Sequence, residues 1–163
     1  MTILDAIRDD HDEIRSLLRE LLETADEDGE KRTDLIHQIK DVVIPHARAE
    51  EAVLYNSMRK ADAPTDMVYH GFAEHAETEV LLHTLVTTNA VDVGWKAVAQ
   101  KLHDSLIHHV DEEESDLFPQ AQEAFSEEQL EAMAEEFLAK KPEVREQSTL
   151  KNSLELFGNL IQP

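Results

Sequence analysis

Apolar residues recur at helical spacing near the start of the chain, and a histidine lies within their stripe. The stripe consists of Ile7, His11, Ile14, Leu18 and Leu21. Steps of four and three residues place these side chains on one face of an α-helix. Thr2 and Asp5 form a capping-box pair, so we expect this helix to begin near residue 2 and to end in the polar stretch 25–30.

Three further stretches repeat the helical pattern, over about residues 33–60, 68–85 and 95–117. Pro45 lies inside the second stretch and removes a backbone hydrogen-bond donor. It therefore indicates either a bend that helps to aim His46 or a helix broken in two. Long helices joined by short polar loops predict an all-α, up-down-up-down four-helix bundle.

A shorter helical pattern follows the predicted bundle. A capping-box pair at residues 126–129 predicts a short fifth helix up to Lys140. We expect residues 148–161 to pack back on the bundle or to contact another subunit. The sequence thus divides into a bundle over residues 1–122 and a C-terminal helical tail over residues 123–163 that packs on the bundle or on a partner.

Two halves of the chain carry the same pattern of histidines and glutamates. The matching residues are His11, His46 and Glu50 in the first half and His75, His109 and Glu113 in the second. The first histidines of the two halves are 64 residues apart and the second histidines are 63 apart. Such a near-constant offset indicates an internal duplication. Two matched halves predict one symmetric site, most simply a site for two metal ions.

The glutamate of each half follows a histidine by four residues, as His46 with Glu50 and His109 with Glu113. Residues four apart point to the same side of a helix, and here that side is the apolar stripe. Burying these charges without partners would cost on the order of several kcal/mol each, and bound cations would offset that cost. Because the chain has no cysteine, the available imidazoles and carboxylates suit iron, manganese or zinc.

These motifs, in the order H, HxxxE, H, HxxxE over roughly residues 1–122, resemble those of the hemerythrin-like, or HHE cation-binding, family. The resemblance implies a four-helix bundle around two non-haem iron ions with a bridging oxide or hydroxide. By the same resemblance the terminal iron ligands are His11, His46, His75 and His109, and the bridging ligands are Glu50 and Glu113. Members of the family bind dioxygen reversibly, sense oxygen or iron, or handle iron, peroxide or nitric oxide.

The third helix departs from the pattern of the dioxygen carriers, which have a second histidine four residues from the first. Here Gly71 lies four residues before His75, and Glu79 lies four residues after it. His70 is five residues away and poorly placed. Glu79 is a possible additional ligand. Tyr55 is another, although a regular helix would turn it about 140° from Glu50, so that its helix would need to be distorted.

Six protein ligands would leave coordination positions open on two metal ions. Together with the resemblance, this favours a soluble protein that binds dioxygen, peroxide or nitric oxide; if the protein is an enzyme, we expect a catalase-like, peroxide-consuming activity. The alternative is an iron- or oxygen-sensing or iron-handling module without turnover. A net charge of −21 should repel nucleic-acid backbones and anionic lipids. We therefore expect no nucleic-acid or membrane partner, a cytoplasmic location, and a monomer or small homo-oligomer.

Further acids and histidines flank the predicted ligands. Glu51, Glu74 and Glu114 could accept hydrogen bonds from ligand imidazoles, but the simpler expectation is that they are solvated. The remaining histidines lack the repeated pattern and are expected at the surface or around the ligands. They are His37, His83, His103 and His108.

Overall fold

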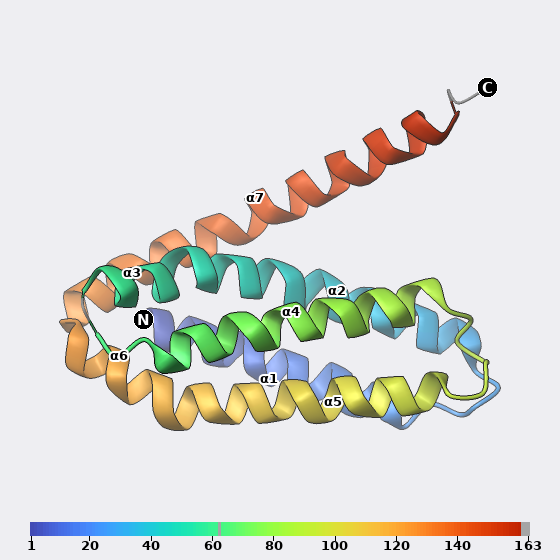
Figure 1. Ribbon diagram of the computed structural model, residues 1–163, viewed down its shortest axis with the longest axis horizontal. Coiled ribbons are helices and arrows are strands. Elements are labelled where there is room, and N and C mark those ends of the chain that lie inside the picture. The colour runs from blue at the N-terminus through green and yellow to red at the C-terminus, as the bar shows by residue number, and fades with distance from the viewer. Residues whose placement is uncertain (62, 161–163) are drawn as a thin grey trace.

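The computed structural model describes residues 1–61 and 63–160, and the side chains as far as residue 147. In chain order the elements are α1 (Ile3–Leu22), α2 (Gly29–Glu50), η1 (Glu51–Tyr55), α3 (Asn56–Lys60), α4 (Asp66–Thr87), α5 (Trp95–Glu112), η2 (Glu113–Leu117), α6 (Phe118–Ala124) and α7 (Glu127–Leu160). The π-helical turns η1 and η2 join α2 to α3 and α5 to α6 without a break. Four long helical rods therefore lie side by side (Figure 1), which confirms the predicted all-α four-helix bundle.

Local capping explains where α1 and α2 begin. The Thr2 backbone N–H donates to the Asp5 carboxylate at 2.8 Å, and the Asp5 N–H donates to the Thr2 hydroxyl at 3.3 Å, as the capping box predicted. Asp28 caps α2 by accepting from the N–H of Lys31. The second helix therefore starts earlier than the apolar pattern indicated. It also runs through Pro45, so a break at that proline is wrong.

The apolar core falls into two clusters, one toward each end of the bundle. The first includes Ile3, Ile7 and Leu54, and the second includes Ile14 and Leu102. Between them lies a layer of buried histidine and glutamate side chains. One helical stripe thus supplies apolar residues to both clusters and polar residues to the layer that separates them.

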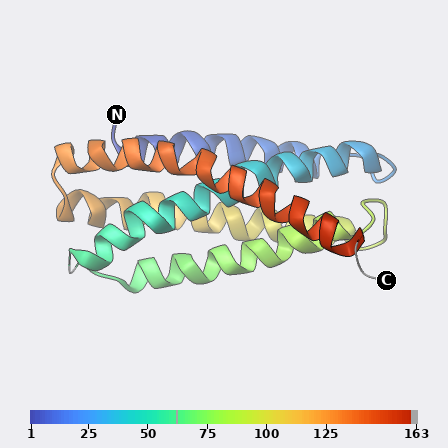
Figure 2. The same cartoon turned by 90° about the horizontal axis from the view of Figure 1, so that it is seen from above.

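Helix α7 packs along the outside of the bundle. Its buried face consists of Leu130, Ala134 and Phe137, and Figure 2 shows it crossing over α2. The predicted end of this helix at Lys140 is wrong, because the helix continues to Leu160. In Figure 1 its C-terminal part rises away from α2. The contacts expected for residues 148–161 involve side chains outside the described part of the structure.

None of the described helices is long and apolar enough to cross a membrane.

Candidate metal centre

Six buried side chains converge between the two apolar clusters, and they are the six residues that the repeated motif singled out. Each has an exposed fraction of 4% or less. Helix α1 supplies His11, α2 supplies His46 and Glu50, α4 supplies His75, α5 supplies His109 and η2 supplies Glu113. The fold therefore brings the whole predicted ligand set together in one place.

Each of the two glutamates faces one histidine from each half of the chain. Glu50 Oε2 lies 4.0 Å from His46 Nε2 and 3.5 Å from His75 Nε2. Glu113 Oε2 lies 3.4 Å from His11 Nε2 and 3.6 Å from His109 Nε2. The two carboxylates thus lie between histidines of the two halves.

The donor atoms fall into two groups that share Glu113. One group joins Glu113 with Glu50, His75 and His109, and the other joins it with His11 and His46. Within each group the possible ligand atoms lie within 4.8 Å of one another. The arrangement therefore has room for two neighbouring metal ions.

Several of these buried atoms have no hydrogen-bond partner. They are Nε2 of His11, both carboxylate oxygens of Glu50 and Oε2 of Glu113. Leaving buried charged oxygens unpaired is costly, whereas a cation coordinated by them would offset their desolvation. The donor set of four imidazoles and two carboxylates suits iron, manganese or zinc. The residues present therefore fit a metal pair.

A carboxylate holds the outward-facing nitrogen of every buried histidine. The Nδ1–H groups of His11 and His75 donate to Glu114 at 2.8 Å and to Glu51 at 2.9 Å. The Nδ1–H of His109 donates to Glu74 at 2.7 Å. Such bonds fix the tautomer and direct Nε2 to the centre. The expectation that these three glutamates are merely solvated is therefore wrong.

The fourth carboxylate is Asp10, which sequence reasoning missed. The Nδ1–H of His46 donates to it at 3.0 Å. A usable signal was present in the repeat, because Asp10 precedes His11 as Glu74 precedes His75. In each half, the acid on the first helix holds the histidine of the second helix.

The carboxylates shift the pKa values of the buried histidines. Burial opposes the charge on His11, but the close carboxylates of Glu113 and Glu114 outweigh it and raise its pKa to about 9. Burial likewise opposes the charge on His75, and the close carboxylates of Glu50 and Glu51 raise its pKa to about 10. Without metal, protons on these imidazoles balance part of the buried negative charge.

The π-helical turn η1 brings Tyr55 to the centre. In a π-helix, residues five apart approach each other along the helix, so Tyr55 can share the face of Glu50. The Tyr55 hydroxyl donates a short hydrogen bond to Glu113. Burial, together with the nearby charges of Glu113 and Glu50, raises the pKa of this phenol well above its usual value. The distortion required by the sequence prediction is therefore present.

The Tyr55 ring occupies space that a side chain at residue 71 would need. A Cβ added to Gly71 would lie 2.8 Å from Cζ of Tyr55 and 3.0 Å from its Cε2, closer than real Cβ contacts. The ring stacks on His75 at a centroid distance of 5.6 Å. In the other half Phe118 stacks on His11 at 6.2 Å. Only one of these two equivalent rings carries a hydroxyl, so the two halves of the centre differ.

Glu79, the other additional ligand considered, lines a small cavity beside three of the histidines. Its carboxylate pairs with the Arg48 guanidinium at 2.5 Å, and Arg48 also pairs with Glu51 at 2.9 Å. Its repeat counterpart, Arg15, pairs with Glu114 at 3.0 Å. Arg48 and Arg15 thus pair with Glu51 and Glu114, which accept the hydrogen bonds of His75 and His11. The structure does not bring Glu79 into the group of buried ligands.

A small, largely apolar cavity adjoins three of the histidines. Its lining includes Ile14, Val43, Thr78 and Leu106, together with His46, His75 and His109. The free space suits about one water-sized molecule. This free space lies directly beside three of the histidines.

The fold and this cluster define a helical-bundle protein with a candidate metal centre. The chain belongs to the Hemerythrin HHE cation binding domain family, which it matches over residues 2–121. It is also similar to a solved structure, a hemerythrin HHE cation binding domain-containing protein from Mycobacterium kansasii. The TM-score is 0.79 at 24% sequence identity, and the match covers 93% of this chain and 91% of that one. That likeness supports the fold.

A curated relative extends well beyond this chain. It is a protein named DNA nickase from Nostoc sp. (strain PCC 7120), 32% identical over 148 residues. The match covers 90% of this chain but 41% of the relative. The chain thus spans less than half the length of that relative.

Proposed function

We propose that this protein is a non-haem di-iron protein that binds dioxygen or a related small oxidant, such as peroxide or nitric oxide. In this proposal the carboxylates of Glu50 and Glu113 bridge the two irons, and the terminal ligands are His11, His46, His75 and His109. The observation that carries the proposal is that each buried glutamate faces histidines of both halves while three of the four glutamate oxygens lack a hydrogen-bond partner.

Two iron ions held by these six side chains would supply redox chemistry and open coordination positions for a small oxidant. The protein residues would set the conditions for that chemistry. The four outer carboxylates keep the Nε2 atoms directed inward, and the apolar cavity beside His46, His75 and His109 limits access to small molecules.

Tyr55 gives the centre a proton donor. Its hydroxyl donates a hydrogen bond to Glu113, and in the metal-free protein its raised pKa favours the neutral phenol. We propose that Tyr55 acts as this donor rather than as an additional ligand, which supports peroxide consumption as the enzymatic form of the function. The Tyr55→Phe variant should then keep both irons. A visible phenolate-to-iron absorption in the parent protein that disappears in the variant would contradict this role.

A second candidate is a sensing or iron-handling module without turnover, and one contact favours it. Lys141 of α7 pairs with Asp10, which holds His46. A change at His46 would therefore reach the tail helix. Limited proteolysis of α7 with and without iron tests this candidate, and an identical cleavage pattern in both states would argue against it.

The di-iron proposal is tested by loading the full chain with iron(II) without oxygen and then admitting air. We expect two irons per chain and the near-ultraviolet absorption of an oxide-bridged pair. The variants His46→Ala and His109→Ala should lose metal and stability, whereas His37→Ala, at an exposed histidine, should change neither. Absence of the absorption, with two irons bound, would reject the oxidant-binding function.

A further inference from the structure

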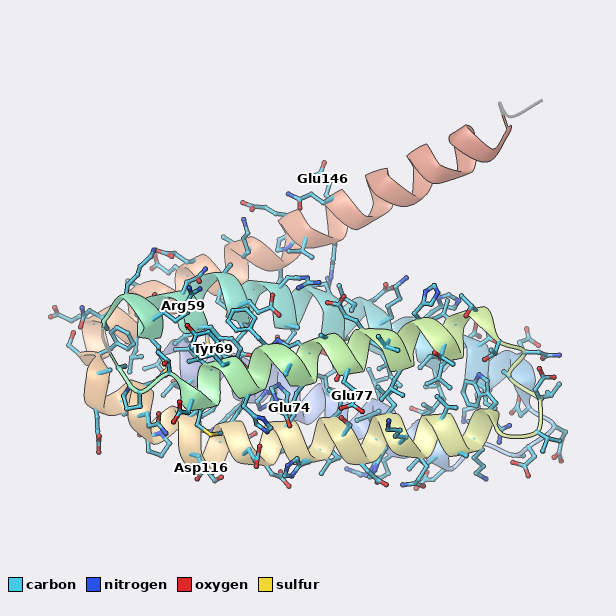
Figure 3. All side chains as sticks on the ribbon, viewed as in Figure 1. Arg59, Tyr69, Glu74, Glu77, Asp116 and Glu146 are labelled. Atoms are coloured by element: carbon cyan, nitrogen blue, oxygen red, sulfur yellow. The ribbon has the colours of Figure 1, made fainter. Side chains whose placement is uncertain are left out.

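A second group of histidines and glutamates lies on the outside of the bundle, where α4 and α5 pack together. Helix α4 contributes His70 and Glu74, and α5 contributes His108 and Glu112, each pair four residues apart. The possible ligand atoms of all four lie within 4.8 Å of one another. Figure 3 shows Glu74 in the seam between the two helices.

We propose that this outer cluster, consisting of these four residues, is a separate site for one divalent cation of the zinc type. Two imidazoles and two carboxylates form a set that zinc accepts in tetrahedral geometry. Metal–ligand bonds of about 2.0–2.2 Å place the donors of a tetrahedron about 3.3–3.6 Å apart. In the structure, Nε2 of His70 lies 3.3 Å from Oε1 of Glu74 and 3.1 Å from Oε2 of Glu112, while Nε2 of His108 lies 3.3 Å from the other Glu112 oxygen, Oε1.

The outer cluster is open to cations without any rearrangement of the bundle. The side chains of His70 and His108 are 50% and 63% exposed, whereas those of Glu74 and Glu112 are 12% and 30% exposed. The carboxylates are thus anchored in the seam between the helices, while the imidazoles approach from the solvent side. The net charge of −21 also raises the local concentration of cations.

The surroundings of the buried centre provide an independent argument for a cation at this place. Three of the four carboxylates that hold buried histidines also pair with a fixed cation. These pairs are Asp10 with Lys141, Glu51 with Arg48 and Glu114 with Arg15. Among the residues that the structure describes, Glu74 pairs with no lysine or arginine and has only histidines as partners. A metal ion in the outer cluster would supply the missing positive charge.

Glu74 connects the outer cluster to the buried centre. Its Oε1 lies 3.3 Å from His70 Nε2, and its Oε2 accepts the Nδ1–H of His109 at 2.7 Å. A cation bound to Oε1 would draw electron density from the carboxylate and weaken its hydrogen bond with His109. The cation would thereby make the His109 imidazole less basic and so a weaker ligand of the buried metal.

Zinc binding to the iron-loaded full chain tests the outer cluster. Titration calorimetry with zinc chloride should find one equivalent per chain, with iron content unchanged. In a His70→Ala/His108→Ala variant the affinity should fall at least about tenfold. A His37→Ala/His83→Ala variant, which removes two other exposed histidines, should bind zinc like the parent. Equal binding in both double variants, or zinc gained only as iron is lost, would overturn the site.

The connection through Glu74 has its own readout and rests on the proposed di-iron function. Zinc should shift the iron absorption of the parent protein and leave the His70→Ala/His108→Ala variant unchanged. Zinc that binds in the outer cluster without shifting that absorption would overturn the connection. The loss of zinc affinity in the His70→Ala/His108→Ala variant, compared with the His37→Ala/His83→Ala variant, is read by calorimetry and needs no iron absorption, so failure of the di-iron proposal is distinguishable from failure of the zinc site.

Discussion

The ring nitrogens of each buried histidine have different tasks. Nδ1 donates to a carboxylate, and Nε2 points to the centre, so each imidazole has one orientation and one tautomer in which it can ligate. The repeated motif predicted the histidines themselves. It did not predict how the carboxylates pair with them, because each pair joins different helices.

Metal binding should release protons. With pKa values of about 9 and 10, His11 and His75 are protonated at pH 7 in the metal-free protein, and both must lose that proton to ligate. We expect at least two protons released per metal pair and an affinity that rises from pH 7 toward pH 9. Calorimetry in buffers of different ionisation enthalpy measures the release, and a proton count of zero would contradict the assigned ligands.

The same shifts make the stability of the metal-free protein depend on pH. Because both folded-state pKa values lie above the ordinary 6.5, their contribution is fully present below pH 6.5 and is lost as the pH rises through 9 to 10. Urea unfolding of metal-free protein should therefore show a falling free energy over that range. The metal-bound protein, whose imidazoles are already neutral, should lack this decline.

Gly71 and Tyr55 form a steric pair that can be tested by a double-mutant cycle. Gly71→Ala would place a methyl group against the Tyr55 ring, and such overpacking costs about 1–3 kcal/mol. Adding Tyr55→Phe removes the hydroxyl nearest to that methyl group, so the double variant should lose less than the sum of the single changes. Urea unfolding measures all three variants. An additive result would mean that the hydroxyl does not occupy this space.

At the scale of the helices, apolar periodicity predicted the four rods but not the two π-helical turns. The residues of η1 keep an apolar pattern that a regular helix would also explain, so the pattern named Tyr55 as a candidate but did not predict the distortion that brings it to Glu113. The tail illustrates the same limit. Lys141 meets Asp10 across 131 residues, a contact that depends on how α7 crosses the bundle and not on local spacing.

The tail helix should influence metal retention through Lys141. Lys141→Met removes contacts of 2.5 and 2.8 Å to Asp10. The Asp10 carboxylate, which accepts the hydrogen bond of His46, then has one partner fewer. We expect a chelator to remove iron up to about tenfold faster. This is the low end of the effects of changing residues that hydrogen-bond to metal ligands. Lys140→Met removes the same charge from a contact within α7 and is the control. Equal rates in the two variants would contradict the effect.

At the scale of the whole molecule, the charge of −21 argues against binding to nucleic acid, although one relative is named a DNA nickase. Phosphate backbones would be repelled, most strongly at low salt. Fluorescence anisotropy of labelled single- and double-stranded DNA should therefore show no binding at micromolar protein and low salt. A signal that weakens as salt is added would show that the chain binds DNA, as the name of its relative suggests for that protein.

The polar layer between the two apolar clusters should also affect how the molecule unfolds. Each cluster has its own apolar contacts, and the buried charges between them oppose burial unless metal joins them. With metal bound, the two ends of the bundle should open as one cooperative unit. Without it they should open separately, so that amide hydrogen exchange near Leu54 and near Leu102 would report two different opening free energies. The metal pair would then decide whether this bundle is one folding unit or two.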